Sequence, residues 1–164
     1  MSGYLTDDEG NVEIATGHLV DVPKTCADSD NVSATYAFDL YRSGKSITVD
    51  DTSAGASTVY LTINLSSTSY NGMTLYCLDS VEGYWTISDS SVSVKSTYLT
   101  YGCSAIFPKP KNQTGSRSVG NDFYVSTGFN SYAEPYMGAI GATWKLTYQM
   151  GSTRTWTFTL QNNL

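Results

Sequence analysis

Apolar and polar residues alternate most regularly near the C-terminus, in two runs at 142–150 and 154–160. A period of two is typical of a β-strand with one buried face. The large side chains that share the predicted inner face are Trp144, Leu146, Tyr148, Met150, Trp156, Phe158 and Leu160. Opposite residues of a hairpin lie on the same face, so a three-residue loop at 151–153 is predicted, with Tyr148 opposite Trp156. The same register sets Leu146 opposite Phe158 and joins the apolar residues into one row.

A second hairpin is predicted between residues 34 and 50. Two alternating runs flank the pair Ser43-Gly44, and glycine supplies the positive φ that a two-residue turn requires. In this register Leu40 lies opposite Ile47. Phe38 then lies opposite Val49.

Shorter alternating runs recur along the rest of the chain, separated by turn residues such as Asn71-Gly72 and Glu82-Gly83. They lie at 11–16, 19–22, 58–64, 74–78, 84–88, 92–100, 104–107 and 123–126. Abundant tyrosine and threonine suit pleated, half-buried surfaces, and no long amphipathic helix is found. The sequence therefore predicts a single all-β domain over residues 1–164. An antiparallel β-sandwich, immunoglobulin-like or jelly-roll-like, is favoured, and a small β-barrel is the alternative.

Residues 57–77 resemble the E–F region of immunoglobulin-like sandwiches. In that family an apolar strand leads through a turn into a Tyr-x-Cys strand. Here an apolar run precedes Leu75-Tyr76-Cys77, with Leu75 in the place of the family's tyrosine. The resemblance implies a sandwich in preference to a closed barrel.

The segment 108–121 has a different composition from the rest of the chain. It contains three bases, no acid and almost nothing apolar to bury. A structureless segment of this length is uncommon in a compact domain and is often functional. We predict a flexible polar loop or arm, with Lys109, Lys111 and Arg117 available to an acidic neighbour. A solvated loop without a partner is the alternative.

The net charge of -6 is unevenly distributed. Residues 1–51 hold ten acids against three bases, whereas the remainder holds five acids against six bases. Nucleic acid is not a predicted partner, because the acidic chain would repel a phosphate backbone and no basic stripe offsets this. This uneven distribution of charge suggests that one end of the molecule attracts the other end of a second copy. Solubility alone is the alternative interpretation.

The sequence predicts neither a membrane partner nor secretion. No apolar run reaches the ~18 residues of a membrane-spanning helix. The first residues lack the basic start and apolar core of a signal peptide. If Met1 is the native start, the protein is made and kept in the cytosol or leaves it by a route other than secretion. A leader on the native chain would instead direct it to the cell surface or to secretion.

The three cysteines, Cys26, Cys77 and Cys103, are widely spaced. Without a CxxC motif or a Cys/His pair, no zinc site is predicted. Buried free thiols are expected. A disulfide between Cys77 and Cys103 is the alternative in an oxidising compartment.

The chain lacks a recognisable catalytic set. His18 is the only histidine, and it lies in a predicted strand without a serine nucleophile motif anywhere in the chain. Acids such as Asp79 and Glu82 cannot be placed across a cleft as a glycosidase pair requires. Gly115 and Gly120 have the spacing of a P-loop, which binds phosphate. Asn121-Asp122 stands where that motif requires Lys followed by Ser or Thr, so no phosphate site is predicted. We predict no enzymatic activity, no cofactor and no metal.

The surface is the remaining place for function, and several segments are rich in Tyr, Ser, Gly and Asn, which favour contacts at low entropic cost. The leading hypothesis is a structural or assembly protein of a virus or bacteriophage particle, such as a capsid decoration, fibre or tail protein. It would be made in the host cytoplasm and would contact copies of itself or other structural proteins. The alternative is a glycan-binding or adhesin-like module. The candidate interaction residues are Tyr84, Trp85, Tyr132, Tyr136, Lys109, Lys111 and Arg117.

Overall fold

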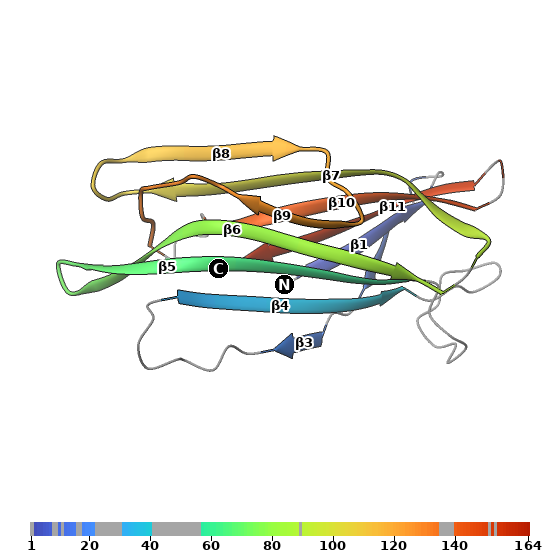
Figure 1. Ribbon diagram of the computed structural model, residues 1–164, viewed down its shortest axis with the longest axis horizontal. Helices are drawn as coiled ribbons and strands as arrows, with labels where there is room; N and C mark the ends of the chain where they lie inside the picture. The colour runs from blue at the N-terminus through green and yellow to red at the C-terminus, as the bar shows by residue number, and fades with distance from the viewer. Residues whose placement is uncertain are drawn as a thin grey trace.

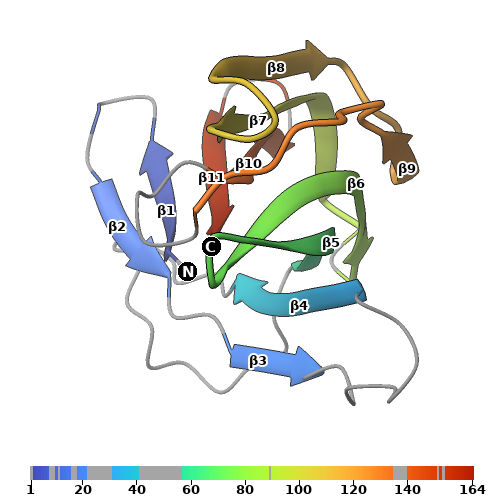
Figure 2. The ribbon, with the colours of Figure 1, turned by 90° about the vertical axis from the view of Figure 1, so that its left-hand side faces the viewer.

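The computed structural model describes residues 2–7, 10, 12–15, 18–21, 31–40, 57–88, 90–134, 140–150, 152 and 154–164. These residues form two antiparallel sheets that pack against each other (Figures 1 and 2). Neither sheet closes on itself, because each ends in two edge strands. The predicted β-sandwich is therefore confirmed, and the alternative of a small β-barrel is wrong.

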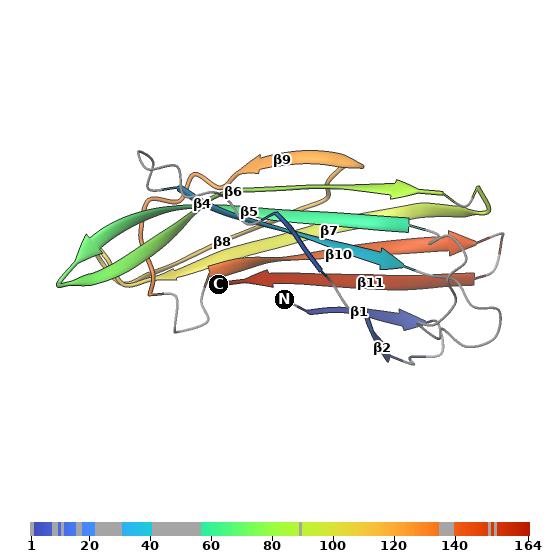
Figure 3. The same ribbon diagram turned by 90° about the horizontal axis from the view of Figure 1, so that it is seen from below.

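The first sheet has six strands and contains both ends of the described chain (Figure 3). Its order is β2 (Val12–Ala15), β1 (Ser2–Asp7), β11 (Arg154–Asn163), β10 (Ile140–Met150), β7 (Val92–Ala105) and β8 (Lys111–Arg117). Strands β10 and β11 lie in the middle, between β1 and β7. This order leaves β2 and β8 as the two edges.

The second sheet has five strands. Its order is β3 (His18–Asp21), β4 (Asn31–Leu40), β5 (Ser57–Tyr70), β6 (Met73–Ile87) and β9 (Asp122–Ser126). His18 lies in a strand, as predicted. The long strands β5 and β6 form its centre, and β3 and β9 are its edges.

The inner faces of the two sheets meet in one apolar core, as the alternation along the strands requires. Trp144 of β10 lies in this core with no exposed surface. Its ring meets the Phe123 ring edge-on, with centroids 4.9 Å apart. The Trp85 ring lies 5.7 Å from it. Phe123 and Trp85 belong to the five-stranded sheet, so Trp144 joins the two layers.

The C-terminal hairpin has the predicted register. Tyr148 pairs with Trp156, and Leu146 pairs with Phe158. The rings of Tyr148 and Trp156 stack with centroids 6.0 Å apart. Trp144, Leu146, Tyr148, Phe158 and Leu160 of the predicted apolar row are buried in the core, and Trp156 packs against it.

The β5–β6 hairpin turns at Asn71-Gly72, as predicted, and both residues have positive φ. It projects at the left of Figure 1. In immunoglobulin-like sandwiches, strands E and F belong to different sheets. Strands β5 and β6 pair along their whole length in one sheet, so the E–F resemblance does not extend to the topology.

The second predicted turn, Glu82-Gly83, is wrong, because both residues lie inside β6. A Cβ on Gly83 would lie 2.9 Å from the Phe123 ring and 2.7 Å from the Tyr60 carbonyl oxygen. Glycine is needed here for close packing in the strand and not for a turn.

The predicted hairpin at 34–50 can be compared only in its first half. Strand β4 pairs along its length with β5, so that Phe38 lies opposite Val59. The other half of the hairpin, including Ile47 and Val49, lies outside the described residues.

The predicted loop at 108–121 is wrong for half of its length. Residues Lys111–Arg117 form strand β8, which pairs with seven consecutive residues of β7. An edge strand needs few apolar residues, because backbone hydrogen bonds hold it and much of it remains in water. Gln113 is the member of β8 that is buried, at 5% exposure. Its amide nitrogen donates to the Ser131 carbonyl (3.0 Å), and its oxygen accepts from the Asn130 N–H (3.1 Å).

Replacing Gln113 by alanine is expected to lower the free energy of unfolding by about 1–2 kcal/mol, because it leaves the buried Ser131 carbonyl and the Asn130 N–H without these partners. Hydrogen exchange is expected to accelerate at Asn130. Thr114→Ala, which changes the next, exposed residue of the same strand, is the control. Equal stability of the two variants would show that the Gln113 hydrogen bonds contribute nothing.

Candidate functional site

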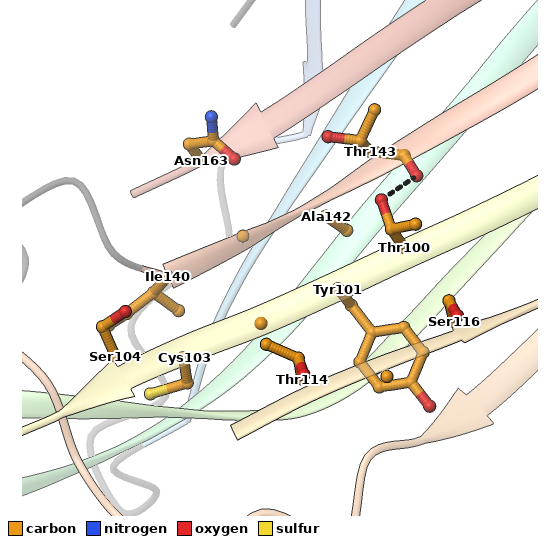
Figure 4. A pocket seen from close by; sticks show the side chains of 13 residues that line it. Thr100, Tyr101, Cys103, Ser104, Thr114, Ser116, Ile140, Ala142, Thr143 and Asn163 are labelled. Atoms are coloured by element: carbon orange, nitrogen blue, oxygen red, sulfur yellow. Dashed lines mark hydrogen bonds between the residues drawn. The ribbon is translucent and has the colours of Figure 1, made fainter. Parts of the chain in front are cut away.

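A hollow lies on the outer face of the six-stranded sheet, where β11, β10, β7 and β8 are adjacent (Figure 4). At its centre Gly141 pairs with Asn163 on one side and Gly102 on the other. Gly102 pairs in turn with Thr114. The two middle members of this row have no side chains of their own, and the Asn163 side chain reaches into the space where a Cβ of Gly141 would lie. The volume of the hollow is about 690 Å³.

Polar side chains surround the two glycines, because residues two positions apart on a strand face the same way. The rim consists of Thr100, Ser104, Thr114, Ser116, Thr143 and Asn163. The Thr100 hydroxyl donates to the Thr143 carbonyl over 3.4 Å (Figure 4). The hydroxyl of the exposed Tyr98 donates to Ser116 Oγ over 2.9 Å, so this aromatic side chain borders the hollow.

The two glycines are present for different reasons. A Cβ on Gly141 would collide with Asn163 Oδ1 and lie 2.5 Å from the Asn162 carbonyl oxygen, so the approach of β11 requires glycine. A Cβ on Gly102 would meet its nearest atom, the Gln113 carbonyl oxygen, at 3.4 Å, an ordinary contact. Gly102 also lacks a positive φ. Neither packing nor backbone conformation requires glycine at position 102.

A second hollow of about 390 Å³ lies on the same face. Its lining consists of Tyr4, Thr6, Lys145, Thr155, Trp156, Thr157 and Thr159. Lys145 pairs with Thr159 on one side and with Tyr98 on the other, and Tyr98 borders the first hollow. The two hollows therefore lie along one band of hydroxyl-bearing side chains.

The first hollow can form hydrogen bonds but has no group suited to acid–base chemistry. Its rim offers hydroxyls and one carboxamide, which donate and accept without titrating near neutral pH. Cys103 lies beneath it on the core side, and burial raises the pKa of its thiol. A buried, protonated thiol is a poor nucleophile. The described lining residues therefore offer hydrogen-bonding groups to a bound molecule.

The cysteines of the core are free thiols. Cys77 and Cys103 are both buried and unpaired, as predicted, and Cys26 lies outside the described residues. The Cys103 thiol donates to the Ser131 carbonyl over 3.5 Å. Within the described ranges, no group of three or more His, Cys, Asp or Glu side chains could hold a metal ion. No helix among the described residues is long and apolar enough to span a membrane.

Alkaline denaturation tests the burial of Cys77. Burial, with smaller contributions from Cys103 and Asp79, raises the pKa of the Cys77 thiol from 9.0 to about 11. Between these values the unfolded chain has lost the proton that the folded chain keeps, so the free energy of unfolding falls as pH rises. Urea titrations across this range should show a steeper fall in the wild type than in Cys77→Ala. Parallel curves would contradict the burial.

The predicted aromatic residues do not form one surface. Tyr84 and Trp85 are consecutive on β6 and therefore point to opposite faces. Tyr84 is 44% exposed on the outer face of the five-stranded sheet, whereas Trp85 is half-buried and packs on Trp144. Tyr132 is half-buried and bridges to Phe107 through its backbone. Tyr136 lies outside the described residues.

Tyr84 has two neighbours on its face that the sequence analysis did not identify. The Tyr60 ring stacks on it, with centroids 4.2 Å apart and an interplanar angle of 12°. Tyr124 of β9 is 67% exposed and pairs with Glu82. The alternation in Phe123-Tyr124-Val125 could have predicted that Tyr124 is exposed. Its two apolar neighbours are buried, so Tyr124 points to the outer face.

The three predicted basic residues are distributed along one segment of the fold. Lys111 and Arg117 are exposed at the two ends of β8, and Lys109 is exposed just before it. All three therefore follow one edge of the six-stranded sheet.

The fold and the hollow define a β-sandwich protein with a polar, non-titrating surface hollow. No protein-family model matches this chain, and no curated protein or solved structure matches it.

Proposed function

We propose that this protein is a non-enzymatic structural component of a virus or bacteriophage particle and that it acts through protein–protein contacts. Its partners are copies of itself or other structural proteins of the particle. The observation that carries the proposal is the outer edge of β8. Its basic side chains, and an edge that no other described strand covers, are features that a protein partner can use.

Strand β8 pairs with β7 alone among the described strands. Its other side therefore presents backbone groups that could pair with another chain. Lys111 and Arg117 give this edge positive charge. Because acids are concentrated in residues 1–51, the edge is complementary to the N-terminal part of a second copy.

Exposed apolar residues at one end of the molecule also support a protein contact. Tyr70 and Met73 flank the turn of the β5–β6 hairpin, and both are exposed. The Tyr70 ring lies 4.4 Å from that of Phe107, and Ile106 beside it is exposed too. Neighbouring exposed apolar side chains often mark interaction sites.

Light scattering coupled to size-exclusion chromatography tests the proposal. The chain should elute as an assembly, or should form one with capsid or tail proteins, and high salt should weaken it by screening the basic edge. Lys111→Glu combined with Arg117→Glu should shift the equilibrium towards the monomer. Lys95→Glu, an exposed change on β7, is the control. A monomer that binds no particle protein would contradict the proposal.

A glycan-binding or adhesin-like module is the second candidate. The observation that favours it is the hollow at Gly102 and Gly141, because a ring of neutral hydroxyls suits a ligand that is itself rich in hydroxyls. Assembly and glycan binding would use different parts of the surface.

A further inference from the structure

We propose that the hollow at Gly102 and Gly141 binds a neutral sugar unit of a glycan chain. This inference rests on the second candidate function and is independent of the assembly proposal. It assigns the site to the outer face of the six-stranded sheet, whereas the sequence had pointed to Tyr84 on the opposite sheet.

The rim of the hollow matches the chemistry of a neutral sugar. Every rim residue is uncharged, and hydroxyl groups both donate and accept hydrogen bonds. Ser104, Thr114 and Asn163 line the hollow and offer two hydroxyls and a carboxamide as hydrogen-bonding groups. The volume of about 690 Å³ lies in the range of small-molecule sites.

Gly102 provides a separate reason to infer an occupant. Glycine weakens a strand and often marks a place where a ligand or another backbone comes close. The backbone of this chain does not need glycine at position 102, and a Cβ there would make only ordinary contacts. It pairs directly with Gly141, so two adjacent strands carry no side chain of their own at this point.

Aromatic and polar groups extend the site towards the second hollow. The Tyr98 side chain beside Ser116 offers an apolar face to the C–H groups of a sugar ring. Lys145 connects Tyr98 to Thr159, which lines the second hollow together with Tyr4. A glycan of several units could therefore lie across the sheet, with one unit over the glycines.

The aromatic face on the opposite sheet is less suitable. The rings of Tyr60 and Tyr84 stack on each other, so each covers a face that a sugar would need. Glu82 and Asp122 stand beside the tyrosines of that face and give it negative charge. The face that carries Tyr60 and Tyr84 therefore serves as the comparison site in the binding experiment.

The experiment begins with an array of neutral and acidic oligosaccharides and continues with an NMR titration of the oligosaccharide that binds. The amide resonances of Gly102, Gly141 and Thr114 should shift. Gly102→Val fills the hollow and should weaken binding by at least about tenfold, while its melting temperature should be no lower than that of the wild type. Ser93→Val places valine on an exposed position elsewhere on β7 and should leave affinity unchanged.

The outcomes separate the site from the function. Retained affinity in Gly102→Val together with loss in Tyr84→Ala would overturn this site and leave glycan binding standing. Binding of acidic glycans alone would overturn the assignment of a neutral ligand. An array without any bound glycan would overturn both this inference and the second candidate function, and would leave the assembly proposal untouched.

Discussion

Replacing Trp144 by alanine is expected to lower the free energy of unfolding by about 3–5 kcal/mol, the largest effect of any change considered. Trp144 has no exposed surface and contacts Phe123 and Trp85 across the sandwich. Its removal leaves a cavity that the two sheets can close only in part. The free energy of unfolding of a small domain is about 5–15 kcal/mol, so this substitution would remove a large part of it. Chemical denaturation followed by circular dichroism measures the change.

Two further variants make this prediction specific. Trp85→Ala removes the same side chain from a half-buried position and should cost less than Trp144→Ala. Trp144→Phe keeps a ring in place and removes an indole N–H that has no hydrogen-bond partner in the described structure. It should cost less than alanine, because no satisfied polar group is lost. Equal losses for Trp144→Ala and Trp85→Ala would contradict the central position of Trp144.

Valine at position 141 is expected to destabilise the protein by about 2–3 kcal/mol, whereas valine at position 102 is expected to cause no loss. The two glycines pair directly, so the strand environment is closely matched. The Cβ at 141 meets Asn163 and the backbone of Asn162, and the Cβ at 102 meets only ordinary contacts. Valine is also favoured over glycine in strands, which benefits position 102. Thermal denaturation of the two variants measures the difference.

A reversed order of stability would contradict the geometry of the hollow. If Gly102→Val were the less stable variant, the glycine would serve the fold, and the main evidence for an occupant would be lost. If both variants were as stable as the wild type, β11 would lie farther from β10 than the structure places it.

The strand architecture was largely predictable because alternation reports burial directly. The register of the C-terminal hairpin followed from joining Tyr148 to Trp156, since a buried face fixes the pairing of opposite residues. Strand β8 was missed because its sequence is polar, and its backbone pairs with β7 whether or not its side chains are apolar. Gly83 was misread as a turn, because a glycine can also make room for a neighbouring ring, here that of Phe123.

The hollow was not predictable from the sequence. Gly102 and Gly141 are unremarkable as separate residues, and only the pairing of β7 with β10 brings them together. The same holds for Tyr60 and Tyr84, which stack because β5 and β6 are neighbours. Sites formed across strands depend on strand order, which local patterns do not specify.

Cosedimentation of the protein with purified virus or bacteriophage particles from its natural source is the most direct test of the proposal that it works as a structural surface. The protein should pellet with the particles in a constant number of copies per particle and should be released by salt. Its presence only in the soluble fraction, free of other structural proteins, would contradict the account.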